Sequence, residues 1–373
     1  MRRRLFRAAV ALAVGGAALV ALTAAAARPA APSFTVVATK LNNPRGVAIG
    51  PGGAVWVAEA GKAGPQCLDK DICIGYTSSL TRWAPNGRTR RFAEGLISAG
   101  GRDGAFATGA NGVSVDPAGQ VFIAMTDAPE CQVPKGLPPN ALGALGKLLR
   151  YSGRTGVTRY ADISGAECAN NYDRTDRNSN PYAVLALAGN RQVVVDAGAN
   201  ALFEVRGPNV KLLAVFPKTA FGAQSVPTSV AQGPDGALYV GEFVGEPARG
   251  KRARRFAARI WKVIPGSTKP TLHARAFNAI TGLAIASDGT MYVTEWSVNP
   301  LSEQEARGDV VRVAPDGKRT RIGFGELHFP SGAALSADGR TLYVSNWSIL
   351  TDTPPTSGPF AGKTGELVRI TGL

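Results

Sequence analysis

Six copies of one hairpin pattern recur along the chain, and this repeat constrains the fold more than any other feature. Each copy reads as a short apolar strand, a turn rich in Asp, Gly and Pro, and a second strand of alternating β-branched and aromatic residues. The aligned first-strand positions are Gly46, Gly112, Ala183, Ser229, Gly282 and Gly332. The steps between them, 66, 71, 46, 53 and 50 residues, are typical of the blades of a β-propeller.

A third strand follows each hairpin, and a fourth follows most of them. The last copy ends at Leu373 without a fourth strand, whereas residues 34–41 form a strand that has no hairpin partner. Pairing between this N-terminal strand and residues 366–370 would close the ring and remove an exposed sheet edge. The sequence therefore predicts an all-β fold, a six-bladed β-propeller of four-stranded antiparallel blades that spans residues 34–373 as one domain.

Composition agrees with a globular protein rich in turns. The 373 residues include 45 Gly and 25 Pro; 18% of the residues are charged and 45% are hydrophobic. These values exclude a long polar tail, a coiled coil and a collagen-like repeat. The formal net charge is +15. Residues 249–262 are strongly basic and could hold an anionic polymer, but a solvated loop is the simpler interpretation. No nucleic-acid-binding motif occurs, so we expect no nucleic-acid partner.

The N-terminus has the three parts of an export signal. Residues 1–7 are basic, residues 8–26 are apolar, and an alanine run ends at Ala27 before a short linker of residues 28–33. The Arg3-Arg4 pair leaves the route open between the Sec and Tat systems. An uncleaved anchor helix is the alternative, because 19 apolar residues can just span a bilayer. We expect cleavage, and hence a secreted or extracytoplasmic protein without a stable membrane span.

Four cysteines occur, an even number in a chain expected to reach an oxidising compartment. They are Cys67, Cys73, Cys131 and Cys168. The spacing favours one bridge from Cys67 to Cys73 and a second from Cys131 to Cys168. Zinc binding is the weaker interpretation, because neither pair has the close spacing of a zinc site and both histidines lie far away in the sequence.

Several stretches resemble the ScyD/ScyE family. They are NPRGVAIGPGGAVWVAEAG at 43–61, SNPY at 179–182, VDAGAN at 195–200 and VPTSVAQGPDGALYVGE at 226–242. The last stretch is the most specific, whereas the other copies also pass as general NHL-like blades. The resemblance covers nearly the whole mature chain and implies an exported bacterial β-propeller associated with scytonemin pigment biosynthesis. The family has no settled activity that could be carried over to particular residues.

An acidic position recurs at the end of the second strand. The residues found there are Glu59, Met125, Asp196, Glu242, Glu295 and Asn346. Four carboxylates would thus ring one mouth of the central channel, and oxygen-rich rings of this kind suit a hard cation such as calcium. The sequence therefore predicts a metal site at Glu59, Asp196, Glu242, Glu295 and Asn346. The alternative is that each acid binds backbone amides of a neighbouring loop and locks one blade to the next.

A second ring lies one residue before the aligned first-strand positions, on the same face. It consists of Arg45, Asn111, Tyr182, Thr228, Thr281 and Ser331. Next to the acidic ring, Trp296 and Trp347 could stack on a sugar or an aromatic ligand, or pack between blades. His328 leads into the last blade on that face and could act as an acid or base, although a structural role is the alternative. We predict ligand contacts from these rings.

No sequence motif of a nucleophilic, phosphate-binding or dinucleotide enzyme occurs. Two function classes remain. The first is a monomeric ligand-binding or scaffold protein that uses the mouth of the central channel for a small polar molecule, a glycan or a protein. The second is a calcium-dependent lactonase or esterase of the gluconolactonase type, although the metal-ligand motifs of that type are not clearly matched.

Overall fold

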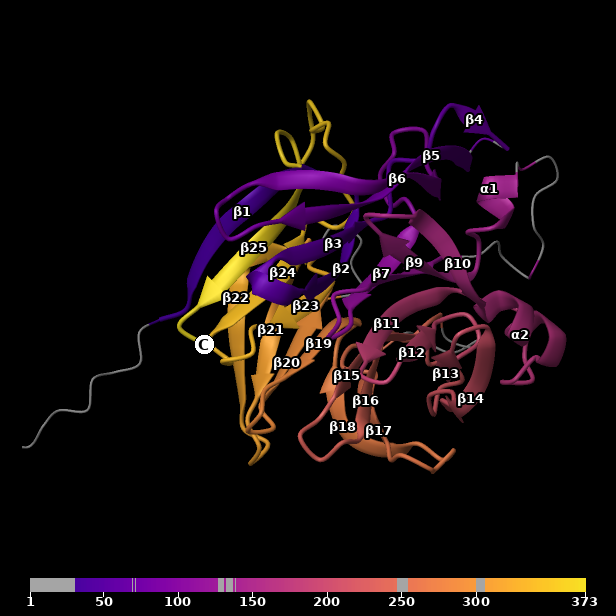
Figure 1. Ribbon diagram of the computed structural model, residues 1–373. Helices are drawn as coiled ribbons and strands as arrows, with labels where there is room; N and C mark the ends of the chain where they lie inside the picture. Colours follow the sequence, from indigo (N-terminus) through magenta and orange to yellow (C-terminus); the bar gives the residue numbers. More distant parts are fainter. Residues whose placement is uncertain are drawn as a thin grey trace, which may run out of the picture. The chain divides into compact units, whose positions relative to one another are not determined.

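The computed structural model describes residues 31–68, 70, 72–126, 131, 137, 139–246, 254–299 and 306–373. The predicted export segment, 1–27, and the start of the predicted linker lie outside the described residues. Residues 249–253 of the basic loop lie outside them as well. From Ala31 to Leu373 the chain forms one unit, and its described strands are grouped into six antiparallel sheets (Figure 1).

Each sheet is one blade, and in blades 1 to 5 the four main strands follow the chain order from the central channel outwards. Blade 1 contains β2 (Pro44–Ile49), β3 (Val55–Glu59), β5 (Cys73–Trp83) and β6 (Thr89–Gly100), with the short β4 (Gln66–Cys67) beside β5; blade 2 contains β7 (Ala110–Val115), β8 (Val121–Met125), β9 (Lys147–Ser152) and β10 (Gly156–Asp162); blade 3 contains β11 (Pro181–Leu187), β12 (Arg191–Asp196), β13 (Ala201–Arg206) and β14 (Asn209–Val215).

The second half of the ring repeats this arrangement. Blade 4 contains β15 (Pro227–Gln232), β16 (Leu238–Glu242), β17 (Ala258–Val263) and β18 (Thr271–Phe277); blade 5 contains β19 (Ile280–Ile285), β20 (Met291–Glu295), β21 (Arg307–Val313) and β22 (Arg319–His328); blade 6 contains β23 (Ala333–Leu335), β24 (Thr341–Asn346), β25 (Gly365–Thr371) and β1 (Ser33–Leu41). The predicted six-bladed β-propeller is therefore confirmed.

The N-terminal strand closes the ring as the sequence predicts. β1 pairs with β25, so that Phe34 lies opposite Ile370 and Val36 lies opposite Val368. In Figure 1 the indigo β1 runs beside the yellow β25. This pairing supplies the missing outer strand of blade 6 and joins the two ends of the described chain, which removes a free sheet edge.

Second strands are buried on both faces because each blade is packed between two others. All five residues of β8 are buried, and successive side chains point to opposite faces of a strand. Ile123 belongs to an apolar cluster shared with blade 1. Phe122 belongs to the next cluster, shared with blade 3. The alternating apolar pattern of the repeat thus fills the spaces between blades rather than one central core.

The first strands approach one another so closely that glycine is required. A Cβ atom on Gly112 would lie 2.7 Å from the carbonyl oxygen of Tyr182, and one on Gly332 would lie 2.6 Å from the carbonyl oxygen of Arg45. Heavy atoms do not approach a Cβ so closely without displacement, so larger residues would push the blades apart. These contacts between backbones make the centre of the propeller narrow.

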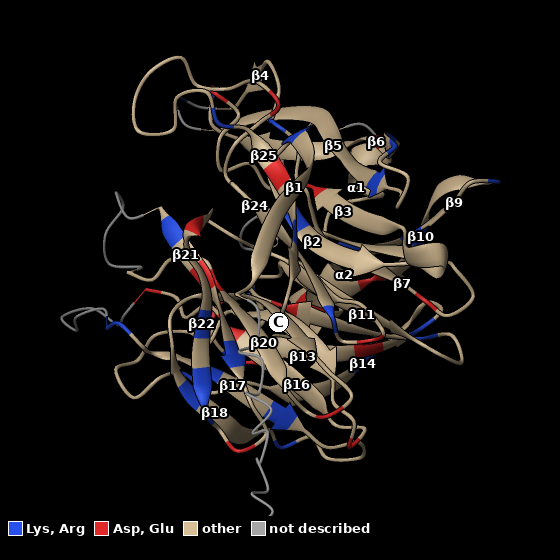
Figure 2. Cartoon of the chain, turned by 90° about the vertical axis from the view of Figure 1, so that its left-hand side faces the viewer, with Lys and Arg blue, Asp and Glu red and all other residues tan. Residues whose placement is uncertain are grey.

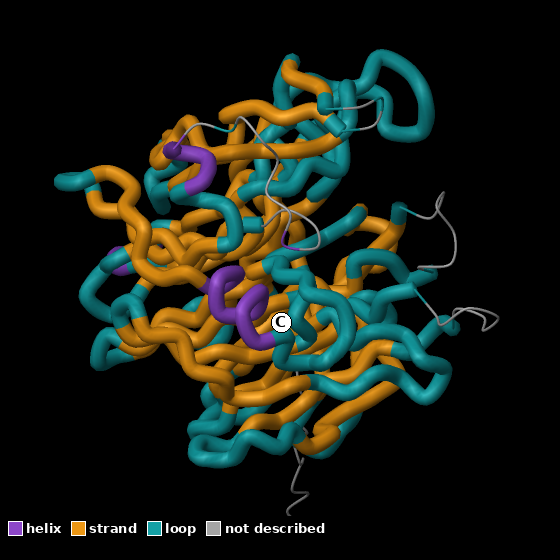
Figure 3. Tube along the Cα trace, turned by 90° about the vertical axis from the view of Figure 1, so that its right-hand side faces the viewer, coloured by secondary structure: helices purple, strands orange, loops and turns teal. Residues whose placement is uncertain are grey.

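Helices are few (Figure 3). The structure describes α1 (Pro139–Leu142), α2 (Ile163–Asn170) and the 3-10 turn η1 (Pro51–Gly53). The sequence favours a short helix at 301–307, but most of these residues lie outside the described residues. No sequence prediction covered α2, whose first turn is capped by Asp162 accepting a hydrogen bond from the Gly165 amide at 2.8 Å. Among the described residues, no helix has the length and apolar composition needed to cross a membrane.

The two faces of the ring differ in their connections. Short turns join first to second strands on one face, here named the turn face, whereas longer segments join second to third strands on the other, the loop face. Both predicted disulfides, Cys67–Cys73 and Cys131–Cys168, are present in loop-face segments, and no cysteine is free. Disulfides of this kind persist in oxidising, extracytoplasmic compartments.

Candidate functional site

The repeated acidic positions are buried at the loop-face ends of the second strands. Glu59, Asp196 and Glu242 have no exposed surface, and Glu295 and Asn346 expose 1% and 2% of theirs. A buried carboxylate is strongly unfavourable unless hydrogen bonds and opposite charges compensate for its lost hydration. The donors around each acid therefore decide what it does.

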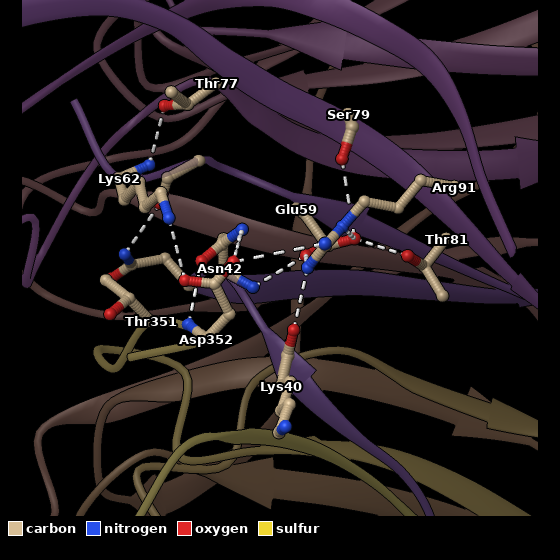
Figure 4. A network of polar contacts seen from close by, with 12 residues as sticks. Lys40, Asn42, Glu59, Lys62, Thr77, Ser79, Thr81, Arg91, Thr351 and Asp352 are labelled. Carbon is tan, nitrogen blue, oxygen red and sulfur yellow. Dashed lines mark hydrogen bonds and ion pairs between the residues drawn. The ribbon is translucent and has the colours of Figure 1, made fainter. Parts of the chain in front are cut away.

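Glu59 is surrounded by donors of its own blade and of the segment that enters it (Figure 4). The amide of Asn42 donates to Oε2 at 2.6 Å. Arg91 on β6 binds the carboxylate in a bidentate manner, with Nε donating to Oε1 and Nη2 donating to Oε2, both at 3.0 Å. The Thr81 hydroxyl also donates to Oε1. The bond to Glu59 raises the pKa of Arg91. Because Asn42 directly follows β1, Glu59 fastens the outer strand of blade 6 to blade 1.

Glu242 in blade 4 has a closely similar set of partners. Arg259 on β17 binds both carboxylate oxygens, with Nη2 at 3.0 Å from Oε2. The Trp261 indole N–H donates to Oε2 at 3.0 Å, and the Ser225 hydroxyl donates at 2.5 Å from the segment that enters the blade. Burial raises the pKa of Glu242, and the bond to Arg259 opposes this rise.

Asp196 in blade 3 binds no arginine. Its acceptor oxygens are used by the backbone amides of Asn180 at 2.6 Å and of Gly198 and Ala199 at 3.0 Å, together with the Ser179 hydroxyl at 2.6 Å. Burial raises the pKa of Asp196 to about 6, and these four hydrogen bonds oppose the rise. The carboxylate therefore fixes the backbone of the segment that leads into β11.

Blade 5 brings two carboxyl groups together. Glu295 lies opposite Asp309 on the neighbouring strand, accepts a hydrogen bond from the Asn278 amide at 2.6 Å, and lies 3.4 Å from Nη2 of Arg321, which also binds Asp309. Burial raises the pKa of Glu295 to about 7 and also raises that of Asp309. One oxygen of each carboxyl, Oε2 and Oδ1, has no hydrogen-bond donor in the described chain. A proton shared by the pair accounts for both.

Blade 6 has an amide at the same position. The Oδ1 atom of Asn346 accepts a hydrogen bond from the His328 backbone amide at 2.7 Å. Its Nδ2 atom donates to Oε2 of Glu366 on β25 at 3.1 Å. Burial raises the pKa of Glu366, and this hydrogen bond opposes the rise.

These contacts do not fit a shared calcium site. Glu59, Asp196, Glu242, Glu295 and Asn346 have separate sets of partners, and each fastens the segment that enters its own blade. Across the described ranges, no group of three or more His, Cys, Asp or Glu side chains is arranged to hold a metal ion. Calcium takes six to eight oxygen ligands, whereas most of these oxygens already accept hydrogen bonds from protein donors, and the one that does not, Oε2 of Glu295, lies 3.4 Å from Nη2 of Arg321. The arrangement supports the alternative interpretation, in which the acids are blade fasteners.

Most residues of the second predicted ring join one blade to the next. The Asn111 side-chain amide donates to the Pro181 carbonyl at 3.4 Å, and the Thr281 hydroxyl donates to the Pro330 carbonyl at 3.0 Å. The Arg45 guanidinium donates to the Ala107 carbonyl, and the Thr228 hydroxyl donates to the Ile280 carbonyl. The Tyr182 side chain makes no such bond with a described residue, and the Ser331 hydroxyl is buried without a partner in the described chain.

The central channel between these residues is too small for an organic ligand. All six first strands line it, and its volume is about 60 Å³. Ligand pockets have volumes of roughly 300–1,000 Å³, and one water occupies about 30 Å³ in the liquid. The channel can hold a few water molecules. Ligand binding at the mouth of the channel stays a prediction, and such a ligand would have to contact the loop face around the mouth rather than enter the channel.

The predicted aromatic contacts are packed into one cluster between blades 5 and 6. The imidazole of His328 stacks on Trp347, with ring centres 4.3 Å apart and planes 5° from parallel. Trp296 packs on Phe329 with ring centres 4.7 Å apart. Burial lowers the pKa of His328. These rings cover the loop-face ends of the two blades, and the structure does not bring them to the acidic positions of blades 1, 3 and 4 through any described contact.

A pocket of about 580 Å³ opens elsewhere on the loop face, over blades 1 to 3. We name it the loop-face pocket. Its lining residues are Leu68, Ile72, Ile74, Ile97, Ser98, Ala99, Gly100, Gly101, Phe106, Thr108, Thr126, Leu137, Leu145, Asn178, Ser179, Asn180, Ala197, Gly198 and Val226. None of these residues is charged. Leu68, Ile72 and Phe106 expose 49%, 43% and 59% of their surface, so apolar side chains are open to solvent at this pocket.

The polar part of the loop-face pocket is concentrated on the blade 3 side. The Asn178 side chain makes no hydrogen bond with a described residue, so its amide is available to a ligand. The Asn180 Oδ1 atom accepts from Asn111 Nδ2 and from the Thr126 hydroxyl, both at 3.1 Å. Asn180 thereby links the pocket to the predicted ring around the channel. Beneath this wall lies Asp196, which holds Ser179 and the Asn180 backbone in place.

Sequence reasoning missed this pocket because several of its wall residues, such as Leu68, Phe106 and Leu137, lie in loops outside the repeat copies. In the sequence, Asp176-x-Asn178-x-Asn180 resembles the start of a calcium loop only weakly, because Pro181 follows where such a loop needs a flexible glycine. A usable signal was the repeat spacing, since the steps of 66 and 71 residues give the first two copies more than a dozen residues beyond the other three steps. These extra residues form the disulfide-bonded loops around the pocket. Cys67 and Cys73 flank Leu68 and Ile72.

Comparisons with known proteins show the fold and no family. No family model and no curated protein matches the chain. Among solved structures, a gluconolactonase from Xanthomonas campestris has a TM-score of 0.55 and 11% identity, covering 94% of this chain and 92% of that one. For a calcium-binding regucalcin from Agrobacterium tumefaciens the TM-score is 0.52, with 14% identity and coverage of 90% and 92%.

A PQQ-bound aldose sugar dehydrogenase from Streptomyces coelicolor is similar to the same degree. Its TM-score is 0.54 with 14% identity, and the match covers 92% of this chain and 99% of that one. These three proteins are described by different activities, and identities this low establish a shared fold alone. Function must therefore be argued from the residues of the site.

Proposed function

We propose that this chain is an exported, monomeric β-propeller of the ScyD/ScyE type that binds an uncharged amphipathic small molecule in the loop-face pocket. The observation that carries the proposal is the pocket itself. Its volume of about 580 Å³ suits a small organic ligand. The lining residues that the structure describes include none with a charge, although the whole chain carries a net charge of +15.

The distribution of side chains favours one orientation of the ligand. Apolar walls from blades 1 and 2, including Ile74, Ile97 and Leu145, would cover a hydrophobic part. Across from them, Asn178 offers an amide that can donate and accept hydrogen bonds. A ligand with one apolar end and one hydrogen-bonding end matches both walls, whereas an ion would lose its hydration without gaining a charged partner among the described lining residues.

The disulfides support this role because they restrain the walls. Cys67–Cys73 closes the loop that carries Leu68 and Ile72, and Cys131–Cys168 ties a loop of blade 2 to α2. Walls that are ordered before binding lose less conformational entropy when the ligand arrives, which favours affinity. Both bonds also agree with export to an oxidising compartment.

Fluorescence titration with Nile red, an uncharged dye that brightens in apolar surroundings, tests the proposal. We expect saturable binding of one dye per chain. Phe106→Asn removes an exposed ring of the pocket, and Asn tolerates the left-handed backbone of this residue, where φ is 55°. Its loss should weaken binding about fivefold, since burying part of an aromatic ring contributes about 1 kcal/mol.

Phe324→Asn is the matched control. Phe324 exposes 54% of its surface on β22 and does not line the pocket, so its replacement should leave the dye affinity unchanged. Non-saturable binding, or an equal loss in both variants, would contradict the proposal. Lactone or aryl-ester turnover that disappears on chelation would instead support the gluconolactonase-type alternative.

A further inference from the structure

A cavity of about 550 Å³ lies at the turn face between blades 1 and 2. Its lining includes Trp56, Arg82, Phe92, Gln120 and Tyr151. It is independent of the loop-face pocket, because it shares no lining residue with it and lies at the opposite ends of the strands. We name it the turn-face pocket.

Three aromatic rings form one wall of the turn-face pocket. The ring centres of Trp56 and Phe92 are 5.5 Å apart, those of Trp56 and Tyr151 are 6.1 Å apart, and those of Phe92 and Tyr151 are 6.0 Å apart. Phe92 and Tyr151 are only partly buried. Ring faces and edges of this kind provide contact area for another ring at little entropic cost.

A basic residue next to this wall is a regular feature of the repeat, as the third strands of the other blades show. In five blades a basic residue on the third strand lies opposite an aromatic residue on the second strand. The pairs are Arg82 with Trp56, Arg150 with Phe122, Lys262 with Tyr239, Arg312 with Tyr292, and Arg369 with Tyr343. The basic residue alone is therefore part of the repeat and indicates no ligand.

Blade 1 departs from the repeat on the fourth strand. In four of those five blades the residue opposite the basic one is threonine, namely Thr158, Thr271, Thr320 and Thr35. In blade 1 it is Arg90. Residues directly opposite one another on antiparallel strands have neighbouring side chains on one face, and two like charges there are destabilising. Blade 1 thus has an arginine pair where the four other blades have a basic residue opposite threonine. Arg82 lines the pocket, and Arg90 lies opposite it and beside the lining residue Phe92.

Neither guanidinium of this pair is neutralised within the described chain. Arg82 and Arg90 make no hydrogen bond or ion pair with a described residue, while Arg91 beside them binds Glu59. The Arg90 guanidinium lies 5.0 Å from the centre of the Phe92 ring. Basic residues occur on many outer strands (Figure 2), so charge alone locates no site. The arginine pair beside an aromatic wall distinguishes this one.

We propose that the turn-face pocket binds a ring compound that carries a carboxylate or sulfate group. The anionic group would lie between Arg82 and Arg90, whose planar guanidinium groups match a carboxylate or sulfate in paired hydrogen bonds. The ring of the ligand would lie against Trp56, Phe92 and Tyr151. A uronic-acid saccharide and an aromatic acid both have this chemistry.

Isothermal titration calorimetry of the disulfide-intact chain at low salt tests the proposal with four probes. They are digalacturonate, 4-hydroxybenzoate, the uncharged disaccharide cellobiose, and inorganic sulfate. We expect binding of digalacturonate or 4-hydroxybenzoate. The probe that binds more tightly shows whether the ligand is a uronic-acid saccharide or an aromatic acid. Binding of cellobiose as tight as that of the acids, equal binding of sulfate, or no binding of any probe would overturn the proposal.

Arg90→Thr restores the residue found in four other blades, so the variant is expected to fold. We expect it to weaken binding of the acid at least tenfold and, without ligand, to raise the melting temperature at low salt because the like-charge pair is gone. Arg275→Thr is the matched control, an exposed fourth-strand arginine of blade 4 with the same charge change; it should alter neither quantity. Equal effects in the two variants would show that net charge alone is responsible.

Discussion

At the end of its second strand blade 5 carries Glu295, whereas blade 6 carries Asn346 at the equivalent position. Both residues accept a hydrogen bond from the backbone of the segment that enters the blade. Both also contact a carboxyl group on the third strand, Asp309 in blade 5 and Glu366 in blade 6. The contacts are alike, but the donors differ: the amide of Asn346 supplies its own hydrogens, while two carboxyl groups need a proton between them.

The hydrogen-bonding arrangement at the end of the second strand is thus the same in both blades, whereas the charge of the residue there differs. Blade 6 needs no arginine, since a neutral amide faces one carboxyl. Blade 5 adds Arg321, whose guanidinium contacts both acids. Blades 1 and 4 need one arginine for one carboxylate. A repeated acid can thus be explained by local compensation in each blade, without a common ligand.

The largest effect is expected from Arg321→Met, which removes the guanidinium group that contacts both buried acids of blade 5. Its partners expose 1% and 0% of their side chains, so at neutral pH a buried negative charge would remain without compensation. We expect a loss of about 3 kcal/mol in the free energy of unfolding, the size found when one partner of a buried ion pair is removed. Urea unfolding monitored by tryptophan fluorescence measures it.

Lys262→Met provides the comparison for that loss. It removes a surface ion pair with Asp235, whose side chains expose 30% and 40% of their area, so we expect a change of at most about 1 kcal/mol. Equal losses in the two variants would mean that the shared proton, rather than Arg321, compensates the charge of blade 5.

An intermediate effect, dependent on pH, is expected from Glu295→Gln, which makes blade 5 resemble blade 6. Burial raises the pKa of Glu295 to about 7, above an ordinary value of about 4.3 for an unfolded chain. The parent therefore keeps this contribution to stability below the unfolded pKa and loses it as the pH rises through 7. The variant cannot ionise, so its stability relative to the parent should rise by on the order of 2 kcal/mol between pH 4 and pH 8.

Asn346→Asp makes the reciprocal change in blade 6 and should have the opposite sign. Two carboxyl groups would then face each other without an arginine contact, so stability relative to the parent should fall as the pH rises. Unfolding curves at pH 4, 6 and 8 compare the two variants. Parallel pH profiles for both variants and the parent would show that the carboxyl pairs do not titrate in this range.

The sequence was sufficient for the architecture because the repeat encodes it locally. Strand alternation, Asp-Gly turns and the unpaired N-terminal strand all follow from adjacent residues, and the disulfides follow from cysteine spacing. The hydrogen-bond partners of a side chain cannot be predicted in this way, because they include residues that are distant in the sequence. Nothing in the VGE motif at 240–242 shows that Arg259 and Ser225 will surround Glu242.

The loop-face pocket could not be derived from the repeat for a related reason. Part of its wall consists of residues in loops outside the repeat copies, such as Leu68 and Leu137. Phe106 and Asn178 are 72 positions apart in the sequence yet line one cavity. The repeat predicts where loops emerge, whereas the packing of those loops decides whether a cavity forms between them.

The smallest effect is expected from the links between blades around the channel, where blades 5 and 6 differ again. The Thr281 hydroxyl of blade 5 donates to the Pro330 carbonyl at 3.0 Å, whereas the Ser331 hydroxyl of blade 6 is buried without a partner in the described chain. Thr281→Val keeps the shape but loses the hydrogen bond, so it should cost about 1 kcal/mol of unfolding free energy. Ser331→Ala removes an unpaired hydroxyl and should be neutral or slightly stabilising. Thermal and urea unfolding of both variants decide between these outcomes, and an equal loss from both would mean that the Thr281 hydroxyl does not link blade 5 to blade 6.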